Sequence, residues 1–365
     1  SLTPRGDVSV FLVRVRPSGT YGFIESFGQS GATRAEDLAV EGSESIAVVG
    51  RFDGRVDFGG ELMTATQDSE AAGTATDGFV AVFSSIGNHR WSRRLGGNRS
   101  DRVTSVDFDS RGNVYVAGTF AGEWTFGEET YRASGESDAY LAKFGADGEP
   151  MWAVVASGEG VETPGGVAVG SEDRVWVVGD YVEDFELSGE SFSTTDRTAM
   201  FLAVLEADGT VDHTDVFGRA SDPTVEDVVA VPDGGIAFGG SFASELKLGV
   251  ATLQSRARRD GFIARYRERG GFDWTDQVGT FDDDSFRALA VSSDRRRIAA
   301  TGVVTEPVDF GTGEVSFYGE TDAFYAEYDA FGNVTSSWTY GGQHEDGGTA
   351  VALTEFGEPL TAGYY

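Results

Sequence analysis

The sequence contains no cysteine, which excludes disulfides, zinc–thiolate sites and thiol nucleophiles. It also lacks any apolar run near the roughly 18 residues that a membrane-spanning helix needs, so we expect no transmembrane segment. Proline is scarce, at 8 of 365 residues, and lysine occurs only at Lys143 and Lys247. Residues 1–7 include neither methionine nor an apolar leader segment, and we expect any secretion signal to have been removed before them.

Positive charge is scarce as well. Lysine and arginine number 28 against 60 aspartates and glutamates, and the formal net charge is −32. This acidic surplus argues against binding to a nucleic-acid backbone, which needs a basic surface. It favours cations, basic partners or solubility in a salty medium. Glycine, in contrast, is abundant at 51 residues without collagen periodicity, which indicates many tight turns between short strands.

One unit recurs six times along the chain. A glycine recurs at intervals of 68, 61, 61, 61 and 62 residues, an aromatic residue stands eight positions before each, and a second glycine column follows. Agreement at all six positions in three columns excludes chance. The first glycine column is Gly19, Gly87, Gly148, Gly209, Gly270 and Gly332; the aromatic column is Phe11, Phe79, Tyr140, Phe201, Phe262 and Phe324; the second glycine column is Gly50, Gly118, Gly179, Gly240, Gly302 and Gly363.

Each repeat predicts four strands, which we call a, b, c and d. Strand a carries small residues (S-V-D-F, 105–108) and strand b is a near-continuous apolar run (V-Y-V-A-G, 114–118). Strand c places aromatic residues and alanine on one face (F-V-A-V-F, 79–83), and strand d is more polar (R-W-S-R-R-L, 90–95). Glycine-containing turns connect c to d. The pattern therefore predicts an all-β fold, a six-bladed β-propeller with four-stranded antiparallel blades.

We expect a single propeller domain over residues 1–365, with repeats near 9–76, 77–137, 138–198, 199–259 and 260–321 and a partial repeat at 322–365. The N-terminal strands c and d should pair with the C-terminal strands a and b, residues 8–15 against 359–365, and close the ring. An open solenoid is the alternative. It is less favoured because its end repeats should be atypical caps, whereas these ends are complementary halves of one blade.

The repeat resembles a known bacterial family. The pattern G-G-x-x-x-D, then D-x-x-G-N-V-Y-V-A-G-T-F (109–120), then D-A-Y-L-A-K-F-x-A-D-G (138–148) is similar to the β-propeller repeat called SBBP. The resemblance covers nearly the whole chain and is best between residues 96 and 152. In later repeats Pro223 stands in place of the acid of the G-G-x-x-x-D motif, and Ala199 stands in place of the aspartate that opens strand c. It implies a secreted or surface-attached bacterial protein, and it implies no catalytic residues.

Each repeat exceeds the roughly 40–45 residues of a minimal four-stranded blade, and the excess lies between strands b and c. There an apolar-x-apolar-Gly element recurs, as at Trp124, Phe126 and Gly127, and it predicts an additional small hairpin. Two interpretations are open: aromatic-tipped loops that grip a glycan or a protein, or apolar residues that pack onto the blade. Regular recurrence favours packing, because binding sites usually break symmetry.

The connections from strand d to strand a carry acids at one equivalent position, where they would surround a channel mouth. Such carboxylates would hold Ca²⁺, or each would cap its own turn by accepting backbone N–H bonds, and the cap is favoured. The densest cluster, Asp282, Asp283 and Asp284, is the candidate calcium site, although no EF-hand loop is present. The candidate binding face comprises Asp101, Glu162, Asp346, His344 and Trp124. The equivalent position in the six repeats is occupied by Asp101, Glu162, Asp284 and Asp346, and by Thr33 and Pro223.

Motifs for catalysis are missing. The sequence has no G-x-S-x-G, P-loop or H-E-x-x-H motif, and its three histidines, His89, His213 and His344, occupy different places in the repeat. Among aligned strand-a positions only Arg287 supplies the kind of arginine that a sialidase-type pocket needs. His344 and Asp346 form a candidate pair.

We therefore expect a non-enzymatic, secreted or surface-exposed bacterial propeller. It would act as a binding, adhesion or structural scaffold for a protein or glycan, with Ca²⁺ as the candidate cofactor. A glycan hydrolase or lyase with its site at the channel mouth is one alternative, and it should show a symmetry-breaking loop with convergent polar groups. An assembly subunit of a larger surface structure is another, and it should show an exposed apolar patch.

Overall fold

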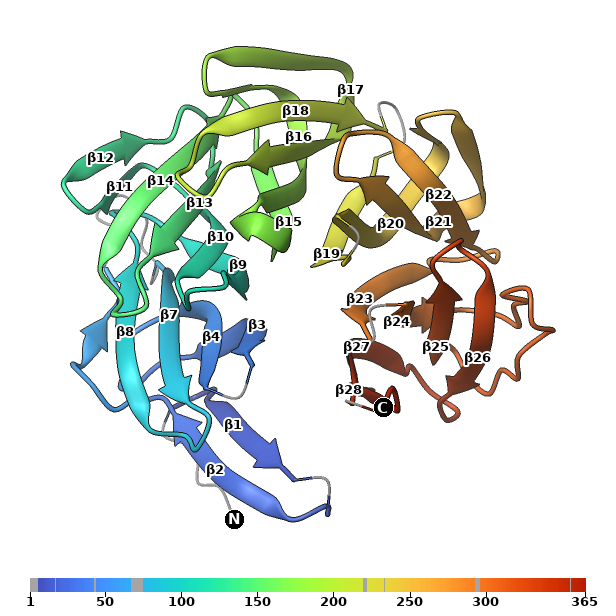
Figure 1. Ribbon diagram of the computed structural model, residues 1–365, viewed down its shortest axis with the longest axis horizontal. Coiled ribbons are helices and arrows are strands. Elements are labelled where there is room, and N and C mark those ends of the chain that lie inside the picture. The colour runs from blue at the N-terminus through green and yellow to red at the C-terminus, as the bar shows by residue number, and fades with distance from the viewer. Residues whose placement is uncertain are drawn as a thin grey trace. The chain divides into compact units, whose positions relative to one another are not determined.

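The structure is a computed structural model that describes residues 6–16, 18–42, 44–66, 75–218, 222–232, 234–292, 296–354 and 356–365, apart from the side chains of 195–197. In these residues the chain is all-β, with strands joined by turns and by a 3₁₀ turn at Ser171–Asp173 (Figure 1). No helix in this part of the chain is long and apolar enough to cross a membrane.

The predicted a–b–c–d order is confirmed as antiparallel ladders. Three four-stranded sheets have this order: β3 (Thr33–Glu41), β4 (Ser45–Phe52), β7 (Asp77–Ser84) and β8 (His89–Leu95); β19 (Thr224–Ala230), β20 (Gly235–Leu248), β21 (Ala251–Arg267) and β22 (Phe272–Val278); and β23 (Ser285–Val291), β24 (Arg297–Val304), β25 (Asp322–Asp329) and β26 (Val334–Tyr340). Two hairpins, β1 (Val10–Val15) with β2 (Tyr21–Phe27) and β27 (Gly347–Leu353) with β28 (Pro359–Tyr364), form separate two-stranded sheets.

An eight-stranded sheet contains two further repeats. Its members are β9 (Arg102–Phe108), β10 (Val114–Phe120), β13 (Asp138–Phe144) and β14 (Pro150–Ser157), followed by β15 (Glu162–Val169), β16 (Val175–Leu187), β17 (Glu190–Leu205) and β18 (Val211–Phe217). The two sets of four join where β14 pairs with β16, through Ala156–Leu187 and Ser157–Glu186.

Burial follows the predicted strand roles. Every residue of β10 and of β13 is buried, as expected for strands b and c with both faces covered. Strand d of the same repeat, β14, is mostly half-buried. The near-continuous apolar run of strand b is thus explained by burial on two faces rather than one.

The second glycine column has a steric cause. Strand a carries a register shift at the same place in successive repeats, for example between Ala35 and Asp37 in β3. This bulge brings a strand-a carbonyl over the glycine of strand b. A Cβ atom added to Gly50 would lie 2.0 Å from the Arg34 carbonyl oxygen, so only glycine fits. The equivalent distance at Gly302 is 1.9 Å.

Four glycines of the first column pack against a ring on the preceding strand d: Gly87, Gly148, Gly209 and Gly332. Gly148, in a c–d turn with φ +81°, lies under Trp91 of the preceding strand d, and an added Cβ would lie 2.5 Å from that ring. The Trp91 Nε1–H also donates to the Ala146 carbonyl at 3.0 Å. Gly332 lies in the same way under Trp274, at 2.7 Å. Through these contacts each of these repeats packs against the next.

The predicted insertion hairpins form in two repeats, as β5 (Arg55–Val56) with β6 (Met63–Thr64) and β11 (Glu123–Phe126) with β12 (Glu129–Arg132). In the third and fourth repeats the same segment extends strands b and c instead, which makes β16, β17, β20 and β21 long. The extension of β20 follows a bulge between Ala243 and Glu245.

The contacts of the chain divide it into two compact units. One comprises residues up to 167 with 184–192 and 207–210, and the other comprises 168–183, 193–206 and 211–365. In the described residues β1 is paired with β2 and β28 with β27, so the predicted ladder between residues 8–15 and 359–365 is not confirmed. The six-membered ring, its closure and the single domain therefore stay predictions.

Candidate functional site

Acids at the start of strand a hold the loops beside them. The carboxylate of Asp101 accepts hydrogen bonds from the N–H groups of Gly97 (2.7 Å) and Ala121 (3.0 Å). The carboxylate of Asp284 accepts from two threonine N–H groups, at 2.6 and 2.9 Å, and from their hydroxyls. Both side chains are buried. At these positions the carboxylates cap turns, as the favoured interpretation expects.

A second acid, which sequence reasoning did not select as a site residue, opens strand c. A carboxylate oxygen of Asp77 lies 2.4 Å from where a Cβ on Gly96 would be, and one of Asp260 lies 1.8 Å from that of Gly279. Strand d therefore ends in glycine because a carboxylate covers that position. These fully buried acids are Asp77, Asp138, Asp260 and Asp322. They stand two residues before the aromatic column, so the same alignment contains their signal.

The two acids meet at the junctions between repeats. Oxygens of Asp322 and Asp346 lie 2.4 and 3.0 Å from a single point, the position of a Cβ on Gly341. At another junction the pKa of Asp101 is raised to about 7, chiefly by burial and in part by the nearby carboxylate of Asp77. These junctions thus place two acidic side chains close together and away from water.

The buried carboxylates of these junctions differ in whether a cation or a hydrogen-bond donor pairs with them. The Arg94 guanidinium pairs with Asp77 at 2.6 Å. Glu162, in contrast, is fully buried, and in the described residues neither of its carboxylate oxygens has a hydrogen-bond partner. The pKa of Glu162 is raised to about 8, chiefly by burial and in part by the Asp138 carboxylate. The Gly158 N–H favours the ionised form, but its geometry is not that of a hydrogen bond.

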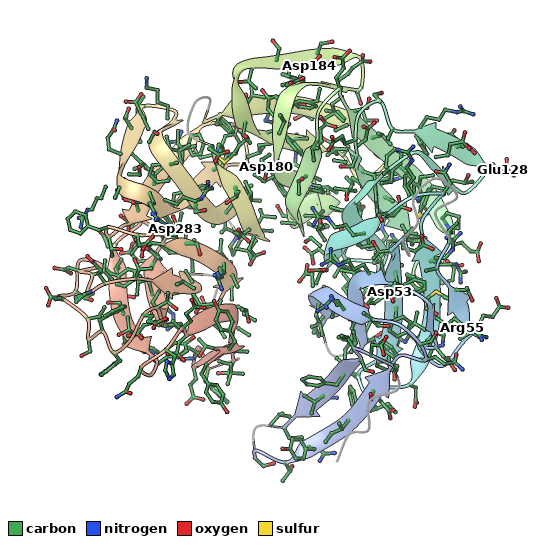
Figure 2. The ribbon with its side chains drawn as sticks, turned by 180° about the vertical axis from the view of Figure 1, so that it is seen from behind. Asp53, Arg55, Glu128, Asp180, Asp184 and Asp283 are labelled. Carbon is green, nitrogen blue, oxygen red and sulfur yellow. The ribbon has the colours of Figure 1, made fainter. Side chains whose placement is uncertain are left out.

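The acids of the candidate calcium cluster point in different directions. Asp284 is turned inward as a cap, whereas Asp282 and Asp283 are exposed, the latter labelled in Figure 2. The Arg258 guanidinium lies 3.2 Å from the Asp282 carboxylate and 4.0 Å from that of Asp283. Over the described ranges, no group of three or more His, Asp or Glu residues has the arrangement of a metal site. Calcium binding here remains a hypothesis.

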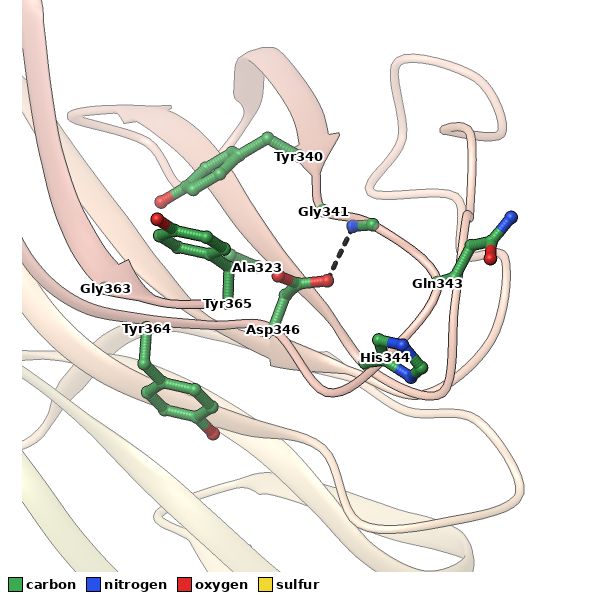
Figure 3. A pocket seen from close by; sticks show the side chains of 10 residues that line it. Ala323, Tyr340, Gly341, Gln343, His344, Asp346, Gly363, Tyr364 and Tyr365 are labelled. Atoms are coloured by element: carbon green, nitrogen blue, oxygen red, sulfur yellow. Dashed lines mark hydrogen bonds between the residues drawn. The ribbon is translucent and has the colours of Figure 1, made fainter.

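His344 and Asp346 line one cavity. This cavity, of about 440 Å³, is also walled by Tyr340, Gly363 and Tyr365 (Figure 3). Asp346 is buried and accepts a hydrogen bond from a loop N–H at 2.6 Å, whereas His344 is exposed. Among the described residues, the Asp346 carboxylate caps the loop before strand a alone, unlike those of Asp101 and Asp284, and its second oxygen lies toward Tyr365 (Figure 3).

Trp124 is a core residue. It is 1 % exposed, and its ring stacks on Tyr140 with centroids 4.4 Å apart. It also contacts Phe120 and Phe126. The insertion residues at the same repeat position are buried as well: Val56, Phe58, Phe185, Leu187, Leu246, Leu248, Val308 and Phe310. The apolar insertion residues pack onto the sheets, so Trp124 does not present its ring to a ligand.

Each of the remaining candidates bonds a different neighbour. His89 bonds the Ser92 hydroxyl at 3.2 Å, and burial lowers its pKa. His213 bonds the Asp212 carboxylate at 3.1 Å. Arg287 donates to the Tyr364 hydroxyl at 3.1 Å. The structure therefore brings together His344 with Asp346 and leaves the other histidines outside that cavity.

Comparison with known proteins agrees with the repeat. Residues 90–119 match the SBBP family of β-propeller repeats. Over these residues the chain is similar to one repeat of that family. It is 31% identical over 144 residues to the regulatory protein FlaEY of Caulobacter vibrioides, a match that covers 40% of this chain and 15% of the relative.

Two solved structures are similar in outline. The Dos1 propeller has a TM-score of 0.41 and 12% identity, with 90% of this chain and 89% of that chain covered. Rhamnogalacturonan lyase YesW has a TM-score of 0.31 and 12% identity, with 89% and 59% covered.

Proposed function

We propose that this SBBP-type chain is a non-enzymatic binding module, built as a six-bladed ring and displayed at or secreted from the bacterial surface. The observation that carries the proposal is that buried and exposed acids have different roles in the loops between strand d and strand a. In each of two loops one acid is buried and fixes the loop, while its neighbours project into solvent. A rigid framework that presents variable loop residues is the usual construction of a binding surface.

The loop before β23 shows these two roles. Asp284 is 1 % exposed and bonds the backbone on both sides, whereas the side chains of Asp282 and Asp283 are 57% and 56% exposed. In the loop before β27, Asp346 is buried beside the exposed His344 and Glu345. The displayed residues are thus polar and mainly acidic.

A basic protein segment is the partner that this surface favours. With a formal charge of −32, the chain attracts cationic partners and repels anionic ones. The match to a relative named as a regulatory protein also favours a protein over a glycan.

Binding of lysine-rich and glutamate-rich peptides and of dextran to the immobilised full chain tests this proposal. We expect the lysine-rich peptide alone to bind, more weakly as salt rises. Replacing Asp282, Asp283, His344 and Glu345 by serine should reduce this binding several-fold. Serine at Glu61, Glu128 and Glu190, exposed acids outside these loops, is the matched control. Equal losses in both variants, or binding of dextran instead, would contradict the proposed surface.

A further inference from the structure

The acids that open strand c and the acids at the start of the following strand a occur together. Four positions along the chain have both acids, and the other two have neither. The four acid pairs are Asp77 with Asp101, Asp138 with Glu162, Asp260 with Asp284, and Asp322 with Asp346; the remaining two positions have Ser9 with Thr33 and Ala199 with Pro223. No position has one acid without the other. This pattern indicates that the two carboxylates of a pair have one joint role.

The two acids of a pair hold different loops. The strand-c acid accepts a hydrogen bond from the insertion between strands b and c, as where the Tyr318 N–H donates to Asp322 at 2.7 Å. The strand-a acid accepts one from the loop between strands d and a, as where the Gly342 N–H donates to Asp346 at 2.6 Å. Contact between the two carboxylates therefore decides whether these loops are held together.

An arginine acts on two of the four pairs. The Arg94 guanidinium pairs with Asp77 at 2.6 Å. Burial raises the pKa of Asp101 and of Asp260, and this rise is opposed by Arg94 at the first and by Arg256 at the second. In these two pairs a permanent positive charge offsets part of the repulsion between the carboxylates.

The other two pairs form no ion pair with an arginine or lysine in the described residues. There, neither oxygen of Glu162 has a hydrogen-bond partner, and Oδ1 of Asp322 has none. Both side chains are fully buried. Burial raises the pKa of each, and in each case the carboxylate of the paired acid contributes to the rise. Each of these two pairs thus contains an acid with a free, buried oxygen.

The free oxygen of Asp322 lies close to its paired acid. Asp322 Oδ1 is 2.4 Å, and Asp346 Oδ2 is 3.0 Å, from a single point, the position of a Cβ on Gly341. Two carboxylates that are this close and removed from water do not both ionise near neutral pH, because one proton between them removes the repulsion.

Other titratable groups surround this pair on every element packed against it. The tyrosines are ordinarily neutral near pH 7, and the exposed acids and histidine are screened by water. They are Glu320 on the insertion, Tyr340 at the end of β26, His344 and Glu345 on the loop before β27, Tyr364 at the end of β28 and Tyr365 after it.

We propose that one proton is shared within the Asp322–Asp346 pair, and another within the Asp138–Glu162 pair, and that each joins an insertion to the loop that follows strand d. In the first pair the proton lies on Oδ1 of Asp322 and is donated to the Asp346 carboxylate, so the pair has one negative charge instead of two. The proton there has the role that Arg94 has beside Asp77. The inference goes beyond the proposed function, because it concerns how the loops are held and not what they bind.

Proton release on unfolding tests the shared proton. Urea unfolding at about pH 5 frees it, because an aspartate in water has a pKa of about 3.9. Asp322→Asn, whose amide donates in place of the O–H, should release about one proton fewer than the wild type. The double variant Asp322→Asn with Asp346→Asn should also release about one fewer, because the pair holds a single proton. Glu320→Gln, at an exposed acid of the same insertion, is the control and should match the wild type.

Two outcomes of this titration would overturn the proposal. A loss of two protons in the double variant would mean that each acid is protonated independently. No difference between Asp322→Asn and the wild type would mean that both acids are ionised in the folded chain. Neither outcome depends on ligand binding, so the peptide test of the proposed function remains separate.

An added arginine provides a second measurement. Thr339 lies opposite Phe324 in its c–d ladder, as Arg94 lies opposite Phe79. We expect Thr339→Arg to place a guanidinium beside Asp322 and to raise the melting temperature by several degrees at about pH 9, where the proton is lost, but little at about pH 5, where it is held. Thr339→Met, of similar length without charge, is the control.

An equal rise of the melting temperature in Thr339→Arg at both pH values would contradict the shared proton. A metal ion in place of the proton is less favoured, because Ca²⁺ needs six to eight oxygens and the pair supplies few. If EDTA lowers the melting temperature of the wild type but not that of Asp322→Asn, a metal ion joins the two acids and the proposal is wrong.

Discussion

Glu162, which opens β15, is buried next to Asp138 and accepts no hydrogen bond in the described residues. Its pKa is raised to about 8 from an ordinary value of 4.5, chiefly by burial. The unfolded chain releases this proton as the pH rises through 4.5, whereas the folded chain holds it until about pH 8. The free energy of unfolding therefore falls across this interval, and the loss is complete above it.

Replacing Glu162 by glutamine should remove this loss. We expect Glu162→Gln to have nearly the wild-type free energy of unfolding near pH 4.5, and one higher by on the order of 1–3 kcal/mol at pH 8. Urea denaturation at both pH values measures the difference. Glu159→Gln, in the exposed part of the same loop, is the control and should change neither value. A Glu162→Gln effect that is independent of pH would show that the folded chain ionises this group without penalty.

At the scale of elements, the insertion hairpin β11–β12 separates a binding role from a packing role. Trp124 is buried against Tyr140, Phe120 and Phe126, whereas Thr125 on the other face is exposed. Trp124→Ala should lower the free energy of unfolding by about 3–5 kcal/mol, the usual cost of removing a core aromatic. Thr125→Ala should cost little. Chemical denaturation of both variants measures this, and a Trp124→Ala variant of wild-type stability would contradict the packing assignment.

Periodicity predicted the strands well because many positions in the two glycine columns have a steric cause. Gly50 must leave room for a carbonyl, and Gly148 must lie under a tryptophan, so both positions tolerate one residue type. The partner of each strand-a acid was harder to predict. Asp77 opens β7 and Asp101 precedes β9 in the next repeat, and only the fold shows that one carboxylate affects the pKa of the other. The insertion segments also departed in part from the predicted small hairpin. The same apolar pattern suits either a separate hairpin, as at Trp124, or a continued strand, as at Leu246.

For the whole molecule, the balance of charge predicts a response to salt. Folding brings 60 acidic side chains together against 28 basic ones, and at about 0.15 M ionic strength repulsion is screened beyond roughly 8 Å. We expect the melting temperature to rise between low and moderate NaCl, because the compact state carries more of the repulsion than the unfolded chain. A flat or falling curve would mean that dispersed or internally paired charges cancel the effect.

Calcium chloride at the same ionic strength distinguishes screening from a site at Asp282, Asp283 and Asp284. Calcium needs six to eight oxygen ligands, and Asp284 already uses both carboxylate oxygens to accept bonds from its own loops. We therefore expect the two salts to raise the melting temperature equally. A larger rise in CaCl₂ that Asp284→Asn removes would establish the calcium site instead. The difference between salts is the quantity to compare, because Asp284→Asn also weakens the cap and lowers the melting temperature in both.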